Sequence, residues 1–565
     1  MKKIAKILVV LLSVLMLFGT VACGTGGKEV DPINRDKELD LSLFHWSMTG
    51  FANAYKESNV TKQLMEELKI SDFEVYTAPY SDWQTSFGLL ASTGELPDFF
   101  KFNGPDNLEQ YNDWIEDEML MCVDDWVTED KYPNLYEHLQ RYKHLNLGSI
   151  SPDGKLYAIP VLSGQPNHVM VIRGNWIDNL NKKKDEIANI KYIKGSDYTL
   201  GNEEYTYPET ISDFYRLAVA MTYADPDENG KDDTYGYTSS DTTMWYNHWI
   251  FNVFGSSYQD YMLNEETGKY ESTWISEGSK NAVKFIKKMR DEGIIEPNFF
   301  ANGPIDGMTQ FFQGKIGMTL INGDWYNGEY AKMKDSFRDD IEAGLVDADR
   351  LMDMVVPLPA GDGNFGSVEG ARGFKGNYGY SWFTGINNDI SDNKKDRILM
   401  LLDYMLSDEG YKLTLYGVEG EHYEVNENGD IVNLIPNDDN GDPRTLKSYD
   451  YAWEIRQMID QSTQYFMPWE ENYDKLNSMI EYVNSEEGGK IYAPPGVAGE
   501  TRTKYEKALF DQSLEWYAKI IYGQNLDGGA MTDFDATWED FVGRYLDNKG
   551  REILNEINEI IASRG

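Results

Sequence analysis

Residues 39–46 read Leu-Asp-Leu-Ser-Leu-Phe-His-Trp, with apolar and polar side chains in alternation. This alternation predicts a β-strand with one buried face. A helical pattern over 60–68 follows, then a second strand over 73–76, a helical pattern over 81–92 and a short apolar run over 96–100. Strand, helix, strand and helix in this order predict a parallel sheet with right-handed crossovers, and therefore an α/β fold.

The same mixture of elements continues to the end of the chain. Further elements are predicted at 208–223 (helix), 279–292 (amphipathic helix), 316–321 (strand), 397–406 (apolar helix), and 505–521 and 537–562 (helices). Thr210 or Ser212 is the expected N-cap of the first of these helices. With 565 residues, the chain exceeds the roughly 250–300 residues at which one core stops growing, so two or more lobes are expected.

The N-terminus has the pattern of a secretory signal. Three lysines open the chain, residues 7–18 are almost wholly apolar, and Gly-Thr-Val-Ala precedes Cys23. We predict that residues 1–22 are a signal peptide, that Cys23 is lipidated as in a bacterial lipobox, and that 23–38 form a flexible tether. The expected location is the extracytoplasmic face of the cell membrane. Plain secretion with an incidental cysteine is the alternative.

Charge and composition exclude some classes of partner. The net charge of −43 argues against nucleic acid and against an anionic membrane surface, because both require Lys and Arg. If Cys23 is lipidated, Cys122 has no partner and no internal disulfide forms. The 14 Trp and 38 Tyr favour a sugar ligand, since aromatic faces stack on the apolar faces of sugar rings. Core packing is the alternative explanation for most of these aromatic residues.

Segment 225–233 has the donor spacing of a calcium loop. Loop positions 1, 3, 5, 7 and 9 are Asp225, Asp227, Asn229, Lys231 (through its backbone carbonyl) and Asp233. Position 6 is Gly230, where the sharp turn requires glycine. Position 12 is Gly236 in place of the bidentate Glu, so a completing oxygen has to come from elsewhere or from water. We predict a structural Ca²⁺ here; the alternative is an Asx-rich turn without metal.

Catalytic motifs do not occur in the sequence. It contains no G-x-S-x-G, H-E-x-x-H, P-loop or Rossmann glycine pattern, and its histidines lack metal-ligand spacing. We therefore expect a binding protein that is not an enzyme. Two well-separated carboxylates suffice for glycosidase chemistry, so a lipid-anchored glycoside hydrolase stays an alternative. A peptide-binding surface lipoprotein is another.

Several short motifs occur in one order along the chain. They are Leu-Leu-Ala-Ser-Thr-Gly-Glu-Leu-Pro-Asp (89–98), Asp-Gly-Lys-Leu-Tyr-Ala-Ile-Pro (153–160), Ile-Arg-Gly-Asn-Trp-Ile-Asp (172–178), the 225–236 segment, Gly-Lys-Ile-Gly-Met (314–318) and Leu-Tyr-Gly-Val-Glu-Gly (415–420). Together with the lipobox-like signal, this order resembles the bacterial extracellular solute-binding proteins of carbohydrate ABC transporters, relatives of maltose-binding protein. The resemblance covers nearly all of the chain after the signal.

The resemblance implies a type II periplasmic-binding-protein fold with two α/β lobes, a hinge, an interlobe cleft and an extra helical C-terminal part. The implied first lobe is 39–160 plus 358–415, and the second is 161–357 plus 416–565. Crossings between the lobes are implied near 158–162, 355–358 and 416–423. The implied function is capture of a carbohydrate or oligosaccharide by a monomer, for delivery to an ABC-transporter permease.

The resemblance also assigns a ligand role to the end of one strand. Residues 322–325, Asn-Gly-Asp-Trp, match a stretch in which the Trp stacks on sugar. Trp325 is therefore the expected stacking ring, and Asp324 the expected acceptor for a sugar hydroxyl.

Other aromatic and polar residues are candidates by their position at strand ends, where α/β ligand sites collect. They are Trp46, Phe102, Asn103, Tyr380 and Trp382; Trp245 is a further candidate because it lies in an aromatic cluster with Tyr246 and Trp249. Ordinary core packing is the alternative for each of them. Strand alternation predicts that His45 points away from Trp46.

Overall fold

The computed structural model describes residues 32–564, except 47, 80–81, 104–107, 142–150, 152, 164–167, 240–243, 258–260, 304–305, 373–379, 438–443, 462–466, 468, 471 and 484–498. The predicted signal peptide, Cys23 and the first part of the predicted tether lie outside the described residues. Among the helices in the described part of the chain, none is both long and apolar enough to cross a membrane.

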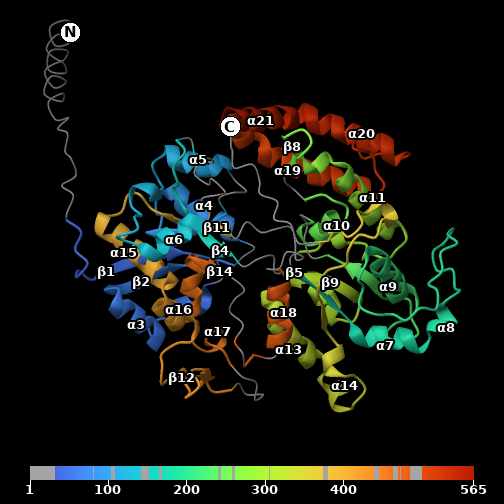
Figure 1. The fold of residues 1–565 in the computed structure, drawn as a ribbon, viewed down its shortest axis with the longest axis horizontal. Coiled ribbons are helices and arrows are strands. Elements are labelled where there is room, and N and C mark those ends of the chain that lie inside the picture. Colours follow the sequence, from blue (N-terminus) through green and yellow to red (C-terminus); the bar gives the residue numbers. More distant parts are fainter. Residues whose placement is uncertain are drawn as a thin grey trace, which may run out of the picture.

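Two separate hydrophobic cores organise the chain. The first gathers buried side chains from 41–159 and 383–459, and the second gathers them from 169–358 and 476–557. In Figure 1 the elements of the first core lie on the left and those of the second on the right. The chain therefore forms the two α/β lobes that were predicted, and each lobe is assembled from separate stretches of sequence.

A six-stranded sheet forms the centre of the first lobe, in the order β14-β4-β11-β3-β1-β2. The strands are β1 (Leu39–Phe44), β2 (Ile70–Tyr76), β3 (Phe99–Phe102), β4 (Ile159–Ser163), β11 (Tyr380–Ile386) and β14 (Asp460–Gln461). Neighbours pair in parallel except β11, which is antiparallel to both β3 and β4. The first strand ends at Phe44, two residues earlier than predicted.

Helices pack on this sheet and bury its apolar side chains. They are α2 (Thr49–Ala54), α3 (Asn59–Glu67), α4 (Trp83–Thr93), α5 (Leu108–Glu116), α6 (Pro133–Arg141), α15 (Asp392–Leu406), α16 (Asp408–Leu415) and α17 (Leu446–Tyr449). Hydroxyl caps fix where two of them begin: Ser58 accepts from the Thr61 amide, and Ser391 from the Lys394 amide. Such a cap stabilises a helix by about 1 kcal/mol.

The second lobe contains a four-stranded sheet in the order β10-β5-β9-β6. Its strands are β5 (His168–Ile172), β6 (Tyr235–Thr238), β9 (Ile316–Asn322) and β10 (Asp353–Val355). β6 and β9 are parallel, whereas β5 is antiparallel to β9 and to β10. Every residue of β5 is buried, as expected for a strand covered on both faces.

The helices of the second lobe include the predicted 208–223 and 279–292 segments. They are α7 (Gly174–Lys182), α8 (Lys184–Ile187), α9 (Ile211–Tyr223), α10 (His248–Val253), α11 (Glu277–Asp291), α12 (Asp306–Phe312), α13 (Tyr326–Ser336), α14 (Arg338–Glu342) and α18 (Tyr473–Val483). Thr210 caps α9 in a full capping box with Asp213, which confirms one of the two predicted N-caps.

The C-terminal helices cover the second lobe. They are α19 (Glu500–Ile521), α20 (Phe534–Tyr545) and α21 (Arg551–Arg564), drawn in red in Figure 1. Trp516, Tyr517 and Phe541 bury their rings in the second core. The predicted extra helical C-terminal part is therefore built into this lobe.

The third crossing between the lobes lies later in the chain than the crossing expected at 416–423. Residues 423–458 add a hairpin, β12 (Tyr423–Val425) with β13 (Ile431–Asn433), and the 3-10 segment η10 (Ala452–Met458). Side chains of η10 bury in the first core, and β14 then joins the first sheet. The chain reaches the second core only at α18. The reason is local packing. β14 pairs in parallel with β4 at the edge of the first sheet, and this pairing keeps the 423–461 segment in the first lobe.

Candidate functional site

One edge of the first sheet collects most of the predicted ligand residues. The carboxyl ends of β1, β3 and β4 lie there together with the amino end of the reversed strand β11. Phe383 pairs with Phe102, and Trp382 pairs with Val161. Trp46 follows β1 and Asn103 follows β3, so these residues from distant parts of the sequence meet at this edge.

Three indole rings form a cluster at this edge. The ring centroid of Trp46 lies 4.9 Å from that of Trp83 and 4.4 Å from that of Trp382. Trp83 also meets Trp382 edge-on at 5.9 Å. Trp46 is only 5 % exposed, whereas Trp382 is half-buried. Part of the Trp382 ring is therefore accessible, and Trp46 and Trp83 pack against it.

A buried lysine lies behind the tryptophan cluster. Nζ of Lys101 is 5.1 Å from the Trp46 ring centroid and 6.0 Å from that of Trp382. It donates a hydrogen bond to the carbonyl of Gln457 at 3.0 Å. Lys101 is fully buried, and burial holds its pKa well below the usual range although Asp460 opposes the shift. A lysine in this position favours the uncharged amine.

His45 does not point away from Trp46, so that prediction is wrong. The two rings stack with centroids 4.6 Å apart, and Nδ1 of His45 hydrogen-bonds the Trp46 carbonyl. The residues lie beyond the end of β1, where strand alternation no longer applies. Burial, with a smaller contribution from Lys101, lowers the pKa of His45, so the imidazole is neutral at neutral pH.

The structure describes the side chain of Phe102 but not that of Tyr380. Phe102 is 3 % exposed and packs among Tyr111, Trp114 and Phe383. This is the environment of a core side chain, the alternative considered for it above. Tyr380 opens β11 opposite Leu162, but its side chain lies outside what the structure describes.

The second sheet has a matching edge, where β6 and β9 end and β5 begins. His168 pairs with Asn322 across the β5–β9 ladder. Trp325 follows β9 in the 3-10 segment η7 (Gly323–Trp325) and is half-buried. Trp245 opens another 3-10 segment, η4 (Trp245–Asn247). The side chains of Trp245 and Asp324 lie outside what the structure describes.

Polar side chains accompany Trp325 at this edge. Tyr246 donates to Oδ1 of Asn322 at 3.4 Å, and its ring meets that of His168 edge-on at 5.2 Å. The ring of His248 lies 4.9 Å from that of His168. Burial, with the neighbouring His248, holds the pKa of His168 well below its usual range. The edge therefore presents neutral hydrogen-bonding groups beside an aromatic ring.

The two edges are joined by a short stretch of chain. β4 ends at Ser163 in the first sheet, and β5 begins at His168 in the second. Five residue steps span at most about 17 Å. The end of β4 and the start of β5 are therefore close, and the tryptophan cluster and Trp325 belong to neighbouring sheet edges.

The predicted calcium loop folds around the side-chain amide of Asn229. Its Nδ2 donates to Asp227 at 2.8 Å and to Asp233 at 3.1 Å. The Gly230 amide donates to both carboxylate oxygens of Asp225 at 3.2 Å. Burial raises the pKa of Asp227, and the carboxylates of Asp225 and Asp233 add to the rise. The carboxylates are therefore close enough to repel one another.

The loop departs from a full calcium site at position 12. A Cβ at Gly236 would lie 2.2 Å from the carbonyl oxygen of Ala218 in α9, so no glutamate fits there. Among the described residues, no group of three or more His, Cys, Asp or Glu side chains is arranged to hold a metal ion. The donors of the loop are of the type that Ca²⁺ prefers, provided that Asn229 turns its side-chain oxygen inward, and the remaining oxygens have to come from elsewhere or from water.

Several residues at the two edges escaped the sequence analysis. They are Trp83, Lys101, His168 and His248, whereas Tyr246 and Asn322 were identified only as neighbours of Trp245 and Trp325. Lys101 could have been identified from the sequence, because it is the one charged residue in the otherwise apolar strand Phe-Phe-Lys-Phe (β3). The others become candidates only through strand order and register, which sequence periodicity does not give.

Comparison with known proteins confirms the resemblance. No family model matches the chain. The chain is 24 % identical over 436 residues to the polygalacturonan/rhamnogalacturonan-binding protein YtcQ of Bacillus subtilis, covering 74 % of both proteins. It is 22 % identical over 519 residues to lipoprotein LipO of the same organism, covering 88 % of both.

Solved structures show the same fold. The Streptococcus pneumoniae ABC-transporter substrate-binding protein FusA in complex with kestose superposes with a TM-score of 0.60 at 16 % identity, covering 93 % of this chain and 99 % of that one. An EF-hand mutant of FusA bound to fructo-nystose gives a TM-score of 0.59 with the same coverage. The chain thus has the two-lobed fold of these substrate-binding proteins.

Proposed function

We propose that this chain, which has the fold of ABC-transporter substrate-binding proteins, captures a carbohydrate outside the membrane and delivers it to a permease. The observation that carries the proposal is the pair of neighbouring sheet edges, each with a half-buried tryptophan, Trp382 and Trp325. Such rings stack on the apolar faces of sugars while polar neighbours bind the hydroxyls. YtcQ is named as a polygalacturonan/rhamnogalacturonan-binding protein, and FusA was solved with kestose.

In this proposal the ligand lies between the lobes. Trp382 and Trp325 stack on sugar rings, and His168, Asn103 and Tyr246 exchange hydrogen bonds with hydroxyls. Trp46 supports Trp382 from behind, while Trp245, Asp324 and Tyr380 remain proposed contacts. The lobes close on the ligand by hinge bending.

No covalent step is part of this function. The ligand leaves unchanged, and the closed form docks on permease subunits whose partner ATPases supply the energy. We place the hinge between a first lobe of 39–163 plus 380–461 and a second lobe formed by the rest of the folded chain, and the two hydrophobic cores and the pairing of β14 with β4 support this division.

The proposal includes a lipid anchor. Residues 1–22 act as the signal peptide, Cys23 carries the lipid, and the segment that begins at Cys23 tethers the folded lobes to the outer face of the cell membrane. The end of the predicted tether 23–38 is bound to α15, because Arg35 pairs with Asp396 and Arg397 donates to the carbonyls of Arg35 and Lys37. The relative LipO is named as a lipoprotein. Mass spectrometry of the protein from a lipoprotein-processing host would show a diacylated or triacylated Cys23; an unmodified Cys23 would contradict the anchor.

We also propose that the 225–233 loop binds Ca²⁺ as a structural ion. Asp225, Asp227, Asn229 and Asp233 would supply side-chain oxygens, and Lys231 its backbone carbonyl. The repulsion among the carboxylates supports this assignment, because a bound cation relieves it. The EF-hand named in the FusA mutant is in keeping with a metal loop in a protein of this fold.

The test is thermal unfolding with a panel of glycans that includes kestose and oligogalacturonides. A ligand at a hundred times its dissociation constant stabilises the folded state by about 2.7 kcal/mol. Recovery of the glycan unchanged supports capture, whereas its cleavage supports the hydrolase alternative. Stabilisation by peptides alone would support the peptide-binding alternative.

A further inference from the structure

The third crossing between the lobes contains a carboxylate, that of Glu470, which binds both the crossing segment and the second lobe. Oε1 of Glu470 accepts a hydrogen bond from the backbone amide of Met467 at 2.8 Å. Met467 packs against Leu415 at the end of α16, which belongs to the first lobe. Oε2 of Glu470 accepts from Nδ2 of Asn327 at 3.1 Å. Asn327 lies in α13 of the second lobe, so this one side chain joins the two lobes.

A second hydrogen bond holds the same amide. Nδ2 of Asn472 donates to Oδ1 of Asn327 at 3.3 Å. Asn472 has a left-handed backbone, φ 64°, a conformation that Asn tolerates better than most residues. Directly after it, α18 begins and buries Leu476 in the second core. Asn327 therefore contacts both Glu470 and Asn472, just before α18 begins.

Asn327 lies two residues from the proposed stacking ring. Trp325 ends η7, and α13 continues from it without a break. Between them, the buried Tyr326 donates to the carbonyl of Met352 at 2.8 Å. Met352 precedes β10, which leads into the second crossing. Three consecutive residues therefore connect the proposed ligand ring to the second and third crossings.

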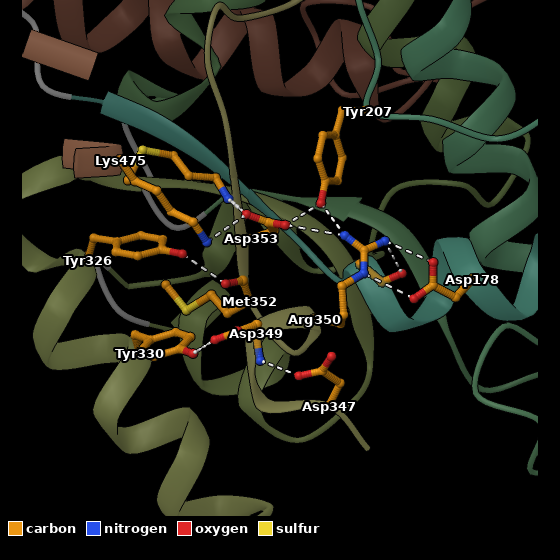
Figure 2. A network of polar contacts seen from close by, with 12 residues as sticks. Asp178, Tyr207, Tyr326, Tyr330, Asp347, Asp349, Arg350, Met352, Asp353 and Lys475 are labelled. Carbon is orange, nitrogen blue, oxygen red and sulfur yellow. Dashed lines mark hydrogen bonds and ion pairs between the residues drawn. The ribbon is translucent and has the colours of Figure 1, made fainter. Parts of the chain in front are cut away.

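A polar network fixes the second crossing on the same lobe (Figure 2). Lys475 of α18 pairs with Asp353 at 3.2 Å, and Arg350 pairs with Asp353 at 3.3 Å and with Asp178 at 2.9 Å. Figure 2 shows Tyr326 and Lys475 approaching the start of β10 together. The starts of α13, β10 and α18 are thereby held as one body.

We propose that Glu470 and Asn327 form the pivot of the third crossing and that they transmit stacking at Trp325 to lobe closure. The second half of this inference rests on the proposed function, and the first half does not. When a ligand displaces the Trp325 ring, the short rigid segment 325–327 moves with it. The carboxylate of Glu470 then carries the displacement to Met467 and the first lobe. Rigid elements of this kind are suited to pass on a displacement.

The pivot is tested without ligand by the distance between the lobes. Leu89 and Leu345 are 65 % and 75 % exposed and lie in the first and second lobe. Spin labels on Leu89→Cys and Leu345→Cys, in a background with Cys23→Ser and Cys122→Ser, report that distance by pulsed electron resonance. In Glu470→Gln an amide NH₂ replaces one acceptor, so a donor faces either Met467 or Asn327. We expect a distance distribution clearly broader than that of the parent.

Glu329→Gln is the matched control. Glu329 lies two residues after Asn327 on α13, and its carboxylate pairs with Lys332 at 2.6 Å. The variant removes the same charge without touching the crossing, and its distribution should equal that of the parent. Asn327→Ser should broaden the distribution like Glu470→Gln. It provides a second variant should Glu470→Gln fail to fold.

Glycan titration tests the transmission. We expect Glu470→Gln to bind kestose or oligogalacturonide about tenfold more weakly than the parent. A tenfold smaller population of the closed form raises the apparent dissociation constant by that factor. Unchanged distributions in both pivot variants overturn the pivot. A broadened distribution with unchanged affinity overturns the transmission. If the parent binds no glycan of the panel, the proposed function and the transmission fall, while a broadened distribution still upholds the pivot.

Discussion

The indole rings of Trp46 and Trp382 lie with their centroids 4.4 Å apart, although one follows the first strand of the chain and the other lies in β11. The contact depends on the reversed direction of β11, which brings its amino end to the carboxyl ends of β1 and β3. The two rings differ in exposure, since Trp46 is buried and Trp382 is half-buried. Their substitution should therefore have different consequences.

Trp46→Ala should mainly reduce stability. Removing this buried ring costs about 3–5 kcal/mol of the free energy of unfolding, as for other Trp→Ala changes in cores. Trp382→Ala should cost less stability and weaken glycan binding at least tenfold, which corresponds to about 1.4 kcal/mol. Urea unfolding and calorimetric titration of both variants measure these effects. Equal losses of stability with no difference in affinity would contradict the assigned roles.

Glu454 should make the stability of the first lobe depend on pH. Its carboxylate accepts a hydrogen bond from the Phe51 amide at 2.7 Å, and burial raises its pKa to about 7. A raised pKa means that the folded state binds the proton more tightly than the unfolded state. The protonated Glu454 therefore stabilises the folded state fully below about pH 4.5, and this stabilisation is lost as the pH rises through about 7.

Glu454→Gln should remove this pH dependence. The variant keeps an acceptor for the Phe51 amide but carries no charge. It should gain about 3 kcal/mol over the parent at pH 8 and nothing at pH 4.5. Urea unfolding at both pH values is the measurement, with the exposed Glu66→Gln as control. A gain of the same size at both pH values would rule out the titration of Glu454 as its cause.

Calcium should raise the melting temperature, and a chelator should lower it. The effect follows from binding to the folded state alone. Asp227→Asn should abolish the response, because it removes a donor at loop position 3. Asp430→Asn is the control: Asp430 closes an Asn-rich turn with Asn426, outside the 225–233 loop. If Asp227→Asn still responds to calcium as the parent does, the ion binds elsewhere.

Much of the fold follows from local pattern. The alternation over 39–46 and the helical spacing of 279–292 correspond to β1 and α11, and Thr210 caps α9 as expected. These features depend on neighbours in sequence, so periodicity and capping rules identify them. The third crossing was placed too early, since no local pattern shows which of two cores the 423–458 segment joins.

The site was predictable only in part. Trp46, Asn103 and Trp382 were identified from strand ends, and the structure brings them to one edge. Lys101 and His168 were missed because their roles depend on register and on burial. A lysine within a strand predicts an exposed position, but β3 is covered on both faces, so Lys101 is buried.

The central claim is that Trp325 and Trp382 hold one glycan between the two lobes. Calorimetric titration of the parent, both Trp→Ala variants and the double variant with the glycan found in the panel tests it most directly. We predict at least a tenfold loss of affinity in each single variant and no detectable binding in the double variant. Full affinity in the double variant, with its folding intact, would contradict the account.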